Sequence, residues 1–318
     1  MTDVTALGEL VIDFSPGGFS QEGHSLYERQ PGGAPSNVLA EVVKLGGSAA
    51  LMGMLGNDEF GEYLLKKVKE SGIGTEGIQF TDKAYTTLAF VHLEKSGERS
   101  FTVMRKPGAD TMLEKEQINT QMIEDSKILH VSSASLTDNP CREAAFWAAK
   151  YAKEHGKLIS FDANYREVLW SRKEAVDVMN SFLPLVDILK VSEEEMELLT
   201  NTNDIPVGSQ MLSENGRKLV TVTMGEKGSY FYYVNGAEYV KPYRVKMVNA
   251  NGAGDAFLGG LLYQMCCTGM RMEDLTLKEM RNIVQFASAC GAICATRQGA
   301  LLCMPTKKEV IDFINKNT

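Results

Sequence analysis

The stretch Val248-Asn249-Ala250-Asn251-Gly252-Ala253-Gly254-Asp255-Ala256-Phe257 decides how this chain folds and what kind of site it carries. Its glycines predict a loop of bare backbone, and the apolar run 256–267 predicts a buried helix directly after that loop. The amides of Gly252, Ala253 and Gly254 would then lie at the helix N-terminus and point at an anion. The sequence therefore predicts an anion-binding turn near the C-terminal end of the chain.

Asp255 would stand beside that anion. A carboxylate in this place can accept the proton of an attacking hydroxyl, while the helix dipole and the amides stabilise the transferred negative charge. The structural alternative is a tight turn followed by a helix-capping aspartate, which gives the same local pattern.

A second glycine-rich segment, Gln30-Pro31-Gly32-Gly33-Ala34-Pro35-Ser36-Asn37-Val38-Leu39-Ala40, also precedes an apolar helical pattern. Paired glycines at 32 and 33 let a ligand approach the backbone closely. Asn37 offers both a hydrogen-bond donor and an acceptor. Together the two segments predict a site built from both ends of the chain.

These segments resemble the motifs of the ribokinase-like (PfkB) carbohydrate kinases. The N-terminal motif of that family is a Gly-Gly pair with a downstream Asn, matched by Gly32, Gly33 and Asn37. The C-terminal motif is D-T-T-G-A-G-D-x-F, of which residues 252–255 and Phe257 match. Asn249, Ala250 and Asn251 replace its usual Asp-Thr-Thr.

Three further segments, 8–14, 162–166 and 190–195, resemble the fructokinases within that family, so the similarity spans essentially the whole chain. The resemblance implies an ATP-dependent kinase that phosphorylates a primary hydroxyl of a small carbohydrate, most simply fructose at its C6 position. The same motifs would serve a kinase for ribose, a ketohexonate or a nucleoside. A catalytically silent sugar-binding relative is the alternative from another class.

The composition excludes some partners. A net charge of -8 and a pI near 5.2 argue against nucleic acid, because phosphate backbones require a basic face. The first residues lack a basic region followed by a long apolar one, and no later run is long and uncharged enough to span a bilayer. We therefore expect a cytoplasmic protein without a membrane partner.

The cysteines and histidines show no metal-ligand spacing. No CxxC pair occurs, so buried free thiols are expected rather than a zinc site or disulfides. The four histidines are scattered and are expected at the surface or in packing contacts.

Short β-branched runs alternate with longer helical patterns, which predicts an α/β fold with a mostly parallel sheet covered on both faces. The length suits one domain over residues 1–318. The expected strands are Val4-Ile12, Ala49-Met54, Ile128-Ser132, Leu158-Asp162, Ile188-Val191 and Leu219-Met224. The expected helices include Glu59-Ser71, Arg142-His155, Arg172-Leu183 and Glu193-Thr200.

Two segments interrupt this alternation, 14–30 and 85–105. The second reads as a β-hairpin around Lys95-Ser96-Gly97-Glu98. The resemblance implies that both belong to an inserted β lid that covers the sugar and excludes water. Because exposed strand edges are prone to pair, we expect a homodimer joined through the lid; a hairpin without function is the alternative.

The resemblance also implies roles for residues near the sugar. Asp13, after the first expected strand, would accept hydrogen bonds from two adjacent sugar hydroxyls, since an ionised carboxylate is an acceptor only. Arg105 and Arg166 would lie near substrate hydroxyls or the transferring phosphate, where the guanidinium fork gives bidentate contacts. A turn cap for the aspartate and surface salt bridges for the arginines are the structural alternatives.

On the nucleotide side, the segment 190–195 resembles the family's N-x-x-E motif, with Ser192 in place of Asn. We expect Lys190 and Ser192 to contact the cofactor ATP, and Glu195 to hold Mg²⁺ through water. The segment Thr221 to Gly228 resembles the nucleotide loop, with a plain hairpin as the alternative. The remaining ATP contacts implied by the resemblance are Thr223, Gly225, Gly228 and Ser288, the last standing where relatives often carry Asn.

Many relatives bind a monovalent cation with the first Asp of the C-terminal motif. Asn249 stands at that position and offers a neutral carbonyl oxygen instead. A cation site loses attraction when its formal negative charge is removed. We therefore expect activation by K⁺ to be weak or absent, with the Asn251 side chain or a water ordering the loop.

Overall fold

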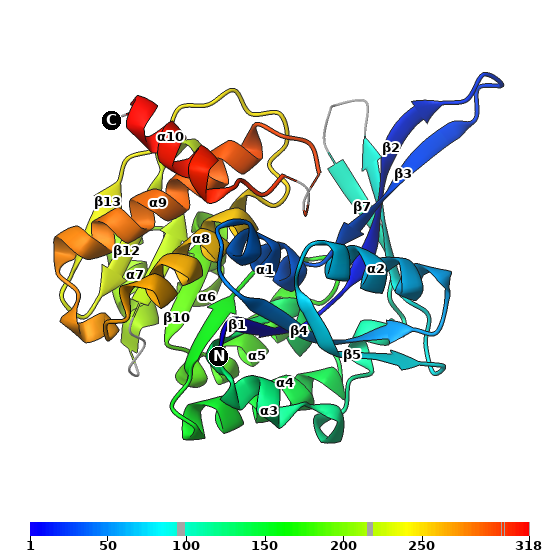
Figure 1. Ribbon diagram of the computed structural model, residues 1–318, viewed down its shortest axis with the longest axis horizontal. Coiled ribbons are helices and arrows are strands. Elements are labelled where there is room, and N and C mark those ends of the chain that lie inside the picture. The colour runs from blue at the N-terminus through cyan, green and yellow to red at the C-terminus, as the bar shows by residue number, and fades with distance from the viewer. Residues whose placement is uncertain (94–98, 215–218, 300, 302, 318) are drawn as a thin grey trace.

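A computed structural model describes residues 1–93, 99–214, 219–299, 301 and 303–317. Within these residues the central sheet has nine strands in the order β13-β12-β11-β10-β9-β8-β1-β4-β5 (Figure 1). Neighbours from β11 to β5 pair in parallel, and β12 and β13 extend one edge in antiparallel fashion. The bounds are β1 Thr2–Leu7, β4 Ala49–Gly56, β5 Gly74–Thr81, β8 Ser126–Ser132, β9 Leu158–Asp162, β10 Ile188–Ser192, β11 Leu219–Thr223, β12 Ser229–Tyr233 and β13 Gly236–Val240.

Helices cover both faces of this sheet, because parallel strands such as the fully buried β4 are apolar on both sides. One apolar core lies under α1 Ala34–Lys44, α2 Glu59–Glu70, α8 Ala253–Thr268, α9 Leu277–Ala295 and α10 Lys307–Asn317. The other lies under α3 Thr120–Glu124, α4 Cys141–Glu154, α5 Arg172–Phe182, α6 Glu193–Thr200 and α7 Ile205–Ser213. Short 3-10 turns are η1 Ala109–Thr111, η2 Lys115–Gln117, η3 Ser133–Leu136, η4 Leu183–Leu185, η6 Gly225–Lys227 and η7 Met272–Asp274.

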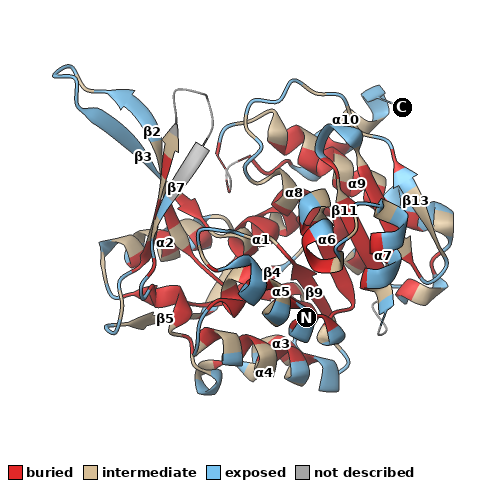
Figure 2. Cartoon of the chain, turned by 180° about the vertical axis from the view of Figure 1, so that it is seen from behind, coloured by how far each residue is buried: buried red, intermediate tan, exposed pale blue. Residues whose placement is uncertain are grey.

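A smaller sheet stands beside the large one and forms the expected lid. In the described part of the chain it has four strands in the order β3-β2-β6-β7. Their bounds are β2 Val11–Phe19, β3 Ser25–Gly32, β6 Thr87–Leu93 and β7 Arg99–Met104. The hairpin turn predicted at residues 95–98 lies outside the described residues. The β2–β3 hairpin projects away from the body as an exposed arm (Figure 2).

The prediction of one strand from Val4 to Ile12 is wrong. β1 ends at Leu7, and a short link carries the chain from the large sheet into β2 of the lid (Figure 1). Asp13 therefore lies inside β2, opposite Gln30 and Ala89, rather than after the end of a strand. The apolar run hid the break because Leu10 and Ile12 remain buried on either side of it.

The prediction of free thiols is also wrong in part. Cys294, near the end of α9, forms a disulfide with Cys303, because the chain turns back after the helix and brings the two Cα atoms to 5.0 Å. Cys141 and Cys290 are free and buried. Across the residues that the structure describes, no helix is both long enough and apolar enough to cross a membrane.

Candidate active site

The predicted anion-binding turn begins α8. Gly252 is the N-cap in the left-handed conformation with φ 81°, which a glycine adopts without strain. The helix begins at Ala253, three residues before the apolar run suggested, so Asp255 lies within its first turn and is only 8% exposed. The Ala253 amide already donates to the carbonyl of Ala250 at 3.2 Å. Because the Ala253 amide has a partner, the predicted contact with an anion depends more on the amides of Gly252 and Gly254.

Asn37 and Asp255 meet although they are 218 residues apart. The Asn37 Nδ2 donates to the Asp255 Oδ2 at 2.8 Å. The contact exists because α1 and α8 pack closely: a Cβ on Gly259, one turn after Asp255, would lie only 2.6 Å from the Val38 carbonyl oxygen. The helices thus bring the two predicted motifs into one site.

The carboxyl of Asp255 titrates near neutral pH. Burial raises its pKa to about 6, the negative charge of Asp162 adds to the increase, and the hydrogen bond from Asn37 opposes it. The positive charges of Lys190 and Arg166 also lower this pKa. A carboxylate that is buried yet ionised at pH 7 suits a general base, which has to take up a proton during the reaction.

The Gly32-Gly33 turn lies against the lid strand that carries Asp13. A Cβ on Gly32 would lie 2.3 Å from the Asp13 Oδ2, so a larger residue here would displace this carboxylate. Gly33 has φ 115° and a Cβ there would lie 2.3 Å from the Glu9 carbonyl oxygen. The two glycines are therefore needed to seat the turn between the lid and the start of α1.

Asp13, Arg166 and Asp255 share one electrostatic environment. Burial raises the pKa of Asp13 to about 6, the charge of Arg166 lowers it, and the charge of Asp255 raises it. Arg166 is exposed and its Nη1 donates to the Tyr165 carbonyl oxygen at 3.0 Å. The contact of Arg166 with substrate hydroxyls or phosphate stays a prediction.

Arg105 is bound by side chains and backbone of the protein. Its guanidinium is buried and forms an ion pair with Asp110 at 2.7 Å. It also donates to the Thr137 Oγ1 at 2.6 Å and to the Ala134 carbonyl oxygen at 2.8 Å. These contacts fasten the end of β7 to the body. Its expected contact with substrate remains a prediction, and the structure gives its nitrogens protein partners.

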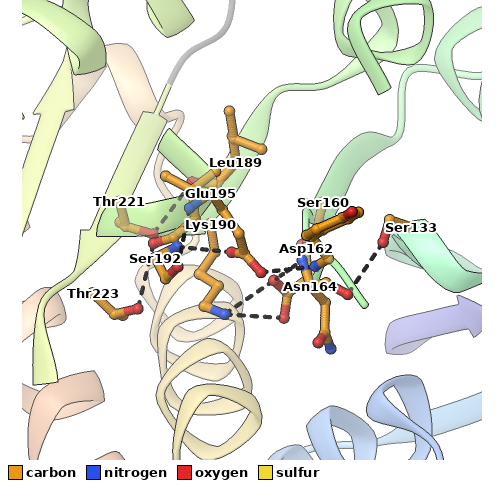
Figure 3. Close-up of polar contacts among 12 residues, drawn as sticks. Ser133, Ser160, Asp162, Asn164, Leu189, Lys190, Ser192, Glu195, Thr221 and Thr223 are labelled. Atoms are coloured by element: carbon orange, nitrogen blue, oxygen red, sulfur yellow. Dashed lines mark hydrogen bonds and ion pairs between the residues drawn. The ribbon is translucent and has the colours of Figure 1, made fainter. Parts of the chain in front are cut away.

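A buried ion pair lies at the carboxyl ends of two neighbouring strands (Figure 3). Lys190 on β10 contacts Asp162 on β9 at 3.1 Å, and both side chains are at least nine-tenths buried. Asp162, Glu195 and Asp255 raise the pKa of Lys190 despite its burial, so the ammonium stays charged. A Cβ on Gly254 would lie 3.2 Å from the Lys190 Nζ. The lysine therefore stands directly below the N-terminus of α8.

Ser192 and Glu195 form a capping box at the start of α6. The Glu195 carboxylate accepts hydrogen bonds from the amides of Ser192 and Tyr165, each at 2.8 Å (Figure 3). Glu195 thus joins the loop after β9 to the start of α6. The water-mediated contact to Mg²⁺ predicted for it stays a prediction; within the described residues no group of three His, Cys, Asp or Glu side chains could hold a metal ion.

The other residues predicted on the nucleotide side lie along β11, the turn after it, and α9. The Thr223 Oγ1 donates to the Val191 carbonyl oxygen at 3.3 Å. Gly225 and Gly228 both have positive φ, and a Cβ on Gly228 would lie 2.3 Å from the Val240 carbonyl oxygen. The Ser288 hydroxyl is 3.2 Å from that of Ser229 on β12. The predicted turn exists, and contact with a nucleotide stays a prediction for all four.

The Asn249 side chain orders the loop before α8. Its Oδ1 accepts a hydrogen bond from the Asn251 amide at 3.0 Å. The amides of Val248 and Asn249 donate to the Ala295 carbonyl oxygen at the end of α9. The contribution expected from the Asn251 side chain or a water stays a prediction.

Two residues of the site were not among the predicted ones. Asp162 pairs with Lys190, and its place at the end of an expected strand was a signal for it. Glu9 accepts a hydrogen bond from the Ala34 amide at 3.0 Å, directly after the Gly-Gly pair. An acid inside the apolar run 4–12 was the available signal for Glu9.

Residues 1–307 match the model of the "pfkB family carbohydrate kinase". The chain belongs to this family. It is 40% identical to Fructokinase-1 of Oryza sativa subsp. japonica over 315 residues, which cover 98% of this chain and 97% of the relative. The identification explains why a Gly-Gly turn and an Asp at a helix N-terminus meet in one place.

Solved structures of related kinases share the whole fold. The fructokinase of Xylella fastidiosa with bound ATP superposes with a TM-score of 0.91 and 33% identity, over 99% of each chain. The fructokinase of Vibrio cholerae O395 in its fructose, ADP and calcium ion bound form gives a TM-score of 0.88 and 34% identity, over 98% of this chain and 99% of that one. This family member therefore has the ribokinase-like fold expected from its motifs, lid included.

Proposed function

We propose that this kinase transfers the γ-phosphoryl group of ATP to the C6 hydroxyl of fructose. The observation that carries the proposal is the buried Asp255 carboxylate at the N-terminus of α8, which accepts a hydrogen bond from Asn37. Asp255 interacts electrostatically with Asp13 and with Arg166. The sugar kinases to which the chain is similar are named fructokinases.

The residues on the sugar side offer acceptors to hydroxyl groups. The Asn37 Oδ1 is buried and accepts no hydrogen bond from the residues that the structure describes. A sugar hydroxyl would satisfy it, and the Asp13 carboxylate would accept from two adjacent hydroxyls. A buried acceptor left without a donor is costly, which favours a hydroxyl-rich ligand in this place.

Asp255 would take the proton of the C6 hydroxyl as its oxygen attacks the γ-phosphorus. The new bond joins that oxygen to phosphorus, the bond to the β,γ-bridging oxygen breaks, and ADP leaves with the electron pair. The amides at the start of α8 stabilise the charge on the transferring group. Asp255 returns its proton to solvent when the product leaves.

The phosphate side fits an anion. Lys190 supplies a buried positive charge below the bare backbone of Gly254, where a Cβ would crowd the ammonium. The divalent metal is Mg²⁺ in this proposal, and when bound it neutralises phosphate charge. Glu195 would contact it through water. Thr223, Gly225, Gly228 and Ser288 would hold the ribose and adenine end of ATP.

A coupled assay for ADP production over a panel of sugars tests the function. Fructose should give the highest kcat/KM, and NMR of the product should show phosphate on C6. Higher kcat/KM for ribose, a ketohexonate or a nucleoside would assign the site to that sugar. Sugar binding by calorimetry without ADP production would identify a silent sugar-binding protein.

We also propose that two copies associate through the lid. The β2–β3 arm presents Phe19, Leu26 and Tyr27 to solvent, with Phe19 75% exposed (Figure 2). A hollow of about 660 Å³ beside the lid is lined partly by Phe60, Tyr85 and Leu88, among other side chains. Apolar side chains on an exposed strand arm favour pairing with a second copy.

Light scattering should therefore give about twice the 35.0 kDa chain mass at micromolar concentration. Phe19→Ser should shift the particle toward the monomer because it removes the most exposed apolar side chain of the arm. Val234→Ser is the matched control: Val234 is an apolar residue, 63% exposed, at the β12–β13 turn far from the lid. A monomeric wild type at this concentration would contradict the proposal.

Activation by potassium should be weak or absent. Asn249 contributes a neutral side chain whose Oδ1 already accepts the Asn251 amide, so the loop is ordered from within the chain. Turnover would be measured without sodium or potassium and again with added KCl at constant ionic strength. A large potassium-specific increase would show that backbone carbonyls suffice, whereas Asn249→Asp should gain potassium activation.

A further inference from the structure

Glu9 occupies the short link between the large sheet and the lid. The link consists of Gly8, Glu9 and Leu10, between the end of β1 and the start of β2. The Glu9 side chain is 8% exposed, although a carboxylate so deeply buried is costly unless it is well bonded. The neighbouring Leu10 already packs into the apolar core. Hydrophobic packing therefore gives no reason for a glutamate at position 9.

Both oxygens of Glu9 hold neighbouring segments. The Oε1 accepts a hydrogen bond from the Ala34 amide at 3.0 Å, and the Oε2 accepts one from the Ser132 hydroxyl at 2.8 Å. Ala34 is the first residue of α1, so the carboxylate lies at the positive end of that helix. Ser132 is the last residue of β8 in the large sheet. Its hydrogen bond therefore anchors the Glu9 carboxylate to the large sheet.

The Glu9 backbone supports the same turn. A Cβ on Gly33 would lie 2.3 Å from the Glu9 carbonyl oxygen, and one on Gly8 would lie 2.5 Å from the Pro35 Cγ. The Gly-Gly turn thus rests on the link by direct contact. A shift of Ala34 away from Glu9 would move Gly32 relative to Asp13, whose Oδ2 lies directly above it.

The charges around Glu9 connect it to the lid anchor. Glu9 acts electrostatically on Arg105, which fastens the end of β7 by its ion pair with Asp110. Burial raises the pKa of Glu9 to about 7, the hydrogen bond from Ser132 opposes this increase, and the charge of Asp110 adds to it. Glu9 acts also on the Cys141 thiol. One buried acid thus lies between the sugar-binding turn and the residue that holds the lid strand.

We propose that Glu9 is a positioning residue for the sugar: it holds the Gly32-Gly33 turn, through the Ala34 amide, in the arrangement that Asp13 requires. The inference rests on the proposed phosphorylation of a sugar. It assigns Glu9 no contact with substrate or ATP and no part in the proton transfer. Its effect should therefore appear in sugar affinity rather than in turnover.

The test compares Glu9→Ala, Glu9→Gln and Ser132→Ala with the wild type, using the sugar with the highest kcat/KM in the panel. At pH 8, above the Glu9 pKa of about 7, Glu9→Ala should raise the KM and the calorimetric Kd for that sugar about tenfold or more, the effect of losing a hydrogen bond to a charged acceptor. The kcat and the KM for ATP should stay within about threefold. Glu9→Gln should restore most of the affinity, because an amide oxygen can accept from Ala34.

Asp204→Ala is the matched control. Asp204 accepts a hydrogen bond from the Val207 amide at 3.0 Å at the start of α7, the same kind of contact at a different helix. It should lower thermal stability without changing sugar affinity. Hydrogen exchange of the Ala34 amide gives a readout that needs no activity: it should accelerate in Glu9→Ala and stay slow in Glu9→Gln.

The outcomes separate this proposal from the proposed function. A wild type that phosphorylates no sugar contradicts the function, and the Ala34 exchange still decides whether Glu9 holds the turn. Unchanged sugar affinity in Glu9→Ala overturns the positioning role. So does a loss of kcat and ATP affinity as large as the loss of sugar affinity. If Glu9→Ala does not fold, Ser132→Ala and Glu9→Gln carry the same comparison, with a smaller increase in KM expected.

Discussion

Asp255→Asn should reduce kcat by about 10²–10⁴, the usual contribution of a general base. The amide keeps the shape of the side chain and can still accept the hydrogen bond that Asn37 donates at 2.8 Å, but it cannot take up the proton of the sugar hydroxyl. Sugar and ATP should bind within about tenfold of the wild type, because the contacts with both ligands remain. Initial rates and calorimetry on the same preparation measure the two effects.

The pH dependence of kcat provides a second test of the role of Asp255. Burial raises the pKa of Asp255 to about 6, and the base must be ionised to act, so kcat at saturating sugar should fall as the pH drops through about 6. Near-normal turnover in Asp255→Asn, or a kcat that stays constant well below this pH, would remove the role of base from Asp255.

Asp13→Ala should weaken sugar binding by about a hundredfold or more, with little effect on ATP affinity. Hydrogen bonds to a charged acceptor contribute about 1.5–3 kcal/mol each, and the Asp13 carboxylate would accept two of them. Asp13→Asn should retain part of the affinity because its amide oxygen can accept from a hydroxyl. Calorimetric titration with fructose and, separately, with ATP distinguishes a sugar contact from a general loss of structure.

Sugar affinity should also depend on pH through Asp13. Burial raises the pKa of this carboxyl to about 6, so the ionised acceptor is lost as the pH falls through that value. Fructose affinity in the wild type should decrease below about pH 6, and in Asp13→Asn this decrease should be absent or smaller. An unchanged fructose affinity in Asp13→Ala would place the residue outside the sugar site.

The α/β architecture and several elements could be predicted from local patterns. β9 and α6 have the bounds that the sequence indicated. The apolar run of β9 ends at Asp162, and three acidic residues mark the first turn of α6. The break inside the run from Val4 to Ile12 could not be predicted, since residues on both sides of it are buried. An apolar run gives the same sequence pattern whether its residues are buried in one sheet or divided between two.

The candidate site shows the same limit. Residue type and spacing predicted Asp255 and the paired glycines as site residues, but nothing local indicates that Asn37 contacts Asp255 across 218 residues. For Arg105 the sequence does not reveal burial, because a basic residue after a hairpin is usually exposed unless it has a buried partner. That partner is Asp110, five residues further along the chain. The disulfide between Cys294 and Cys303 likewise depends on a turn that cysteine spacing does not reveal.

The contact between α1 and α8 has a consequence for how this protein is made. During synthesis α1 emerges early, but the helix that covers its buried Val38 and Val42 includes residues 253–268 and leaves the ribosome near the end. Contacts between segments so distant in sequence form late, and uncovered apolar side chains expose a nascent chain to aggregation. The Gly32-Gly33 turn and Asn37 are therefore synthesised long before Asp255, which lies in the last fifth of the chain, so the proposed site can form only when synthesis is nearly complete.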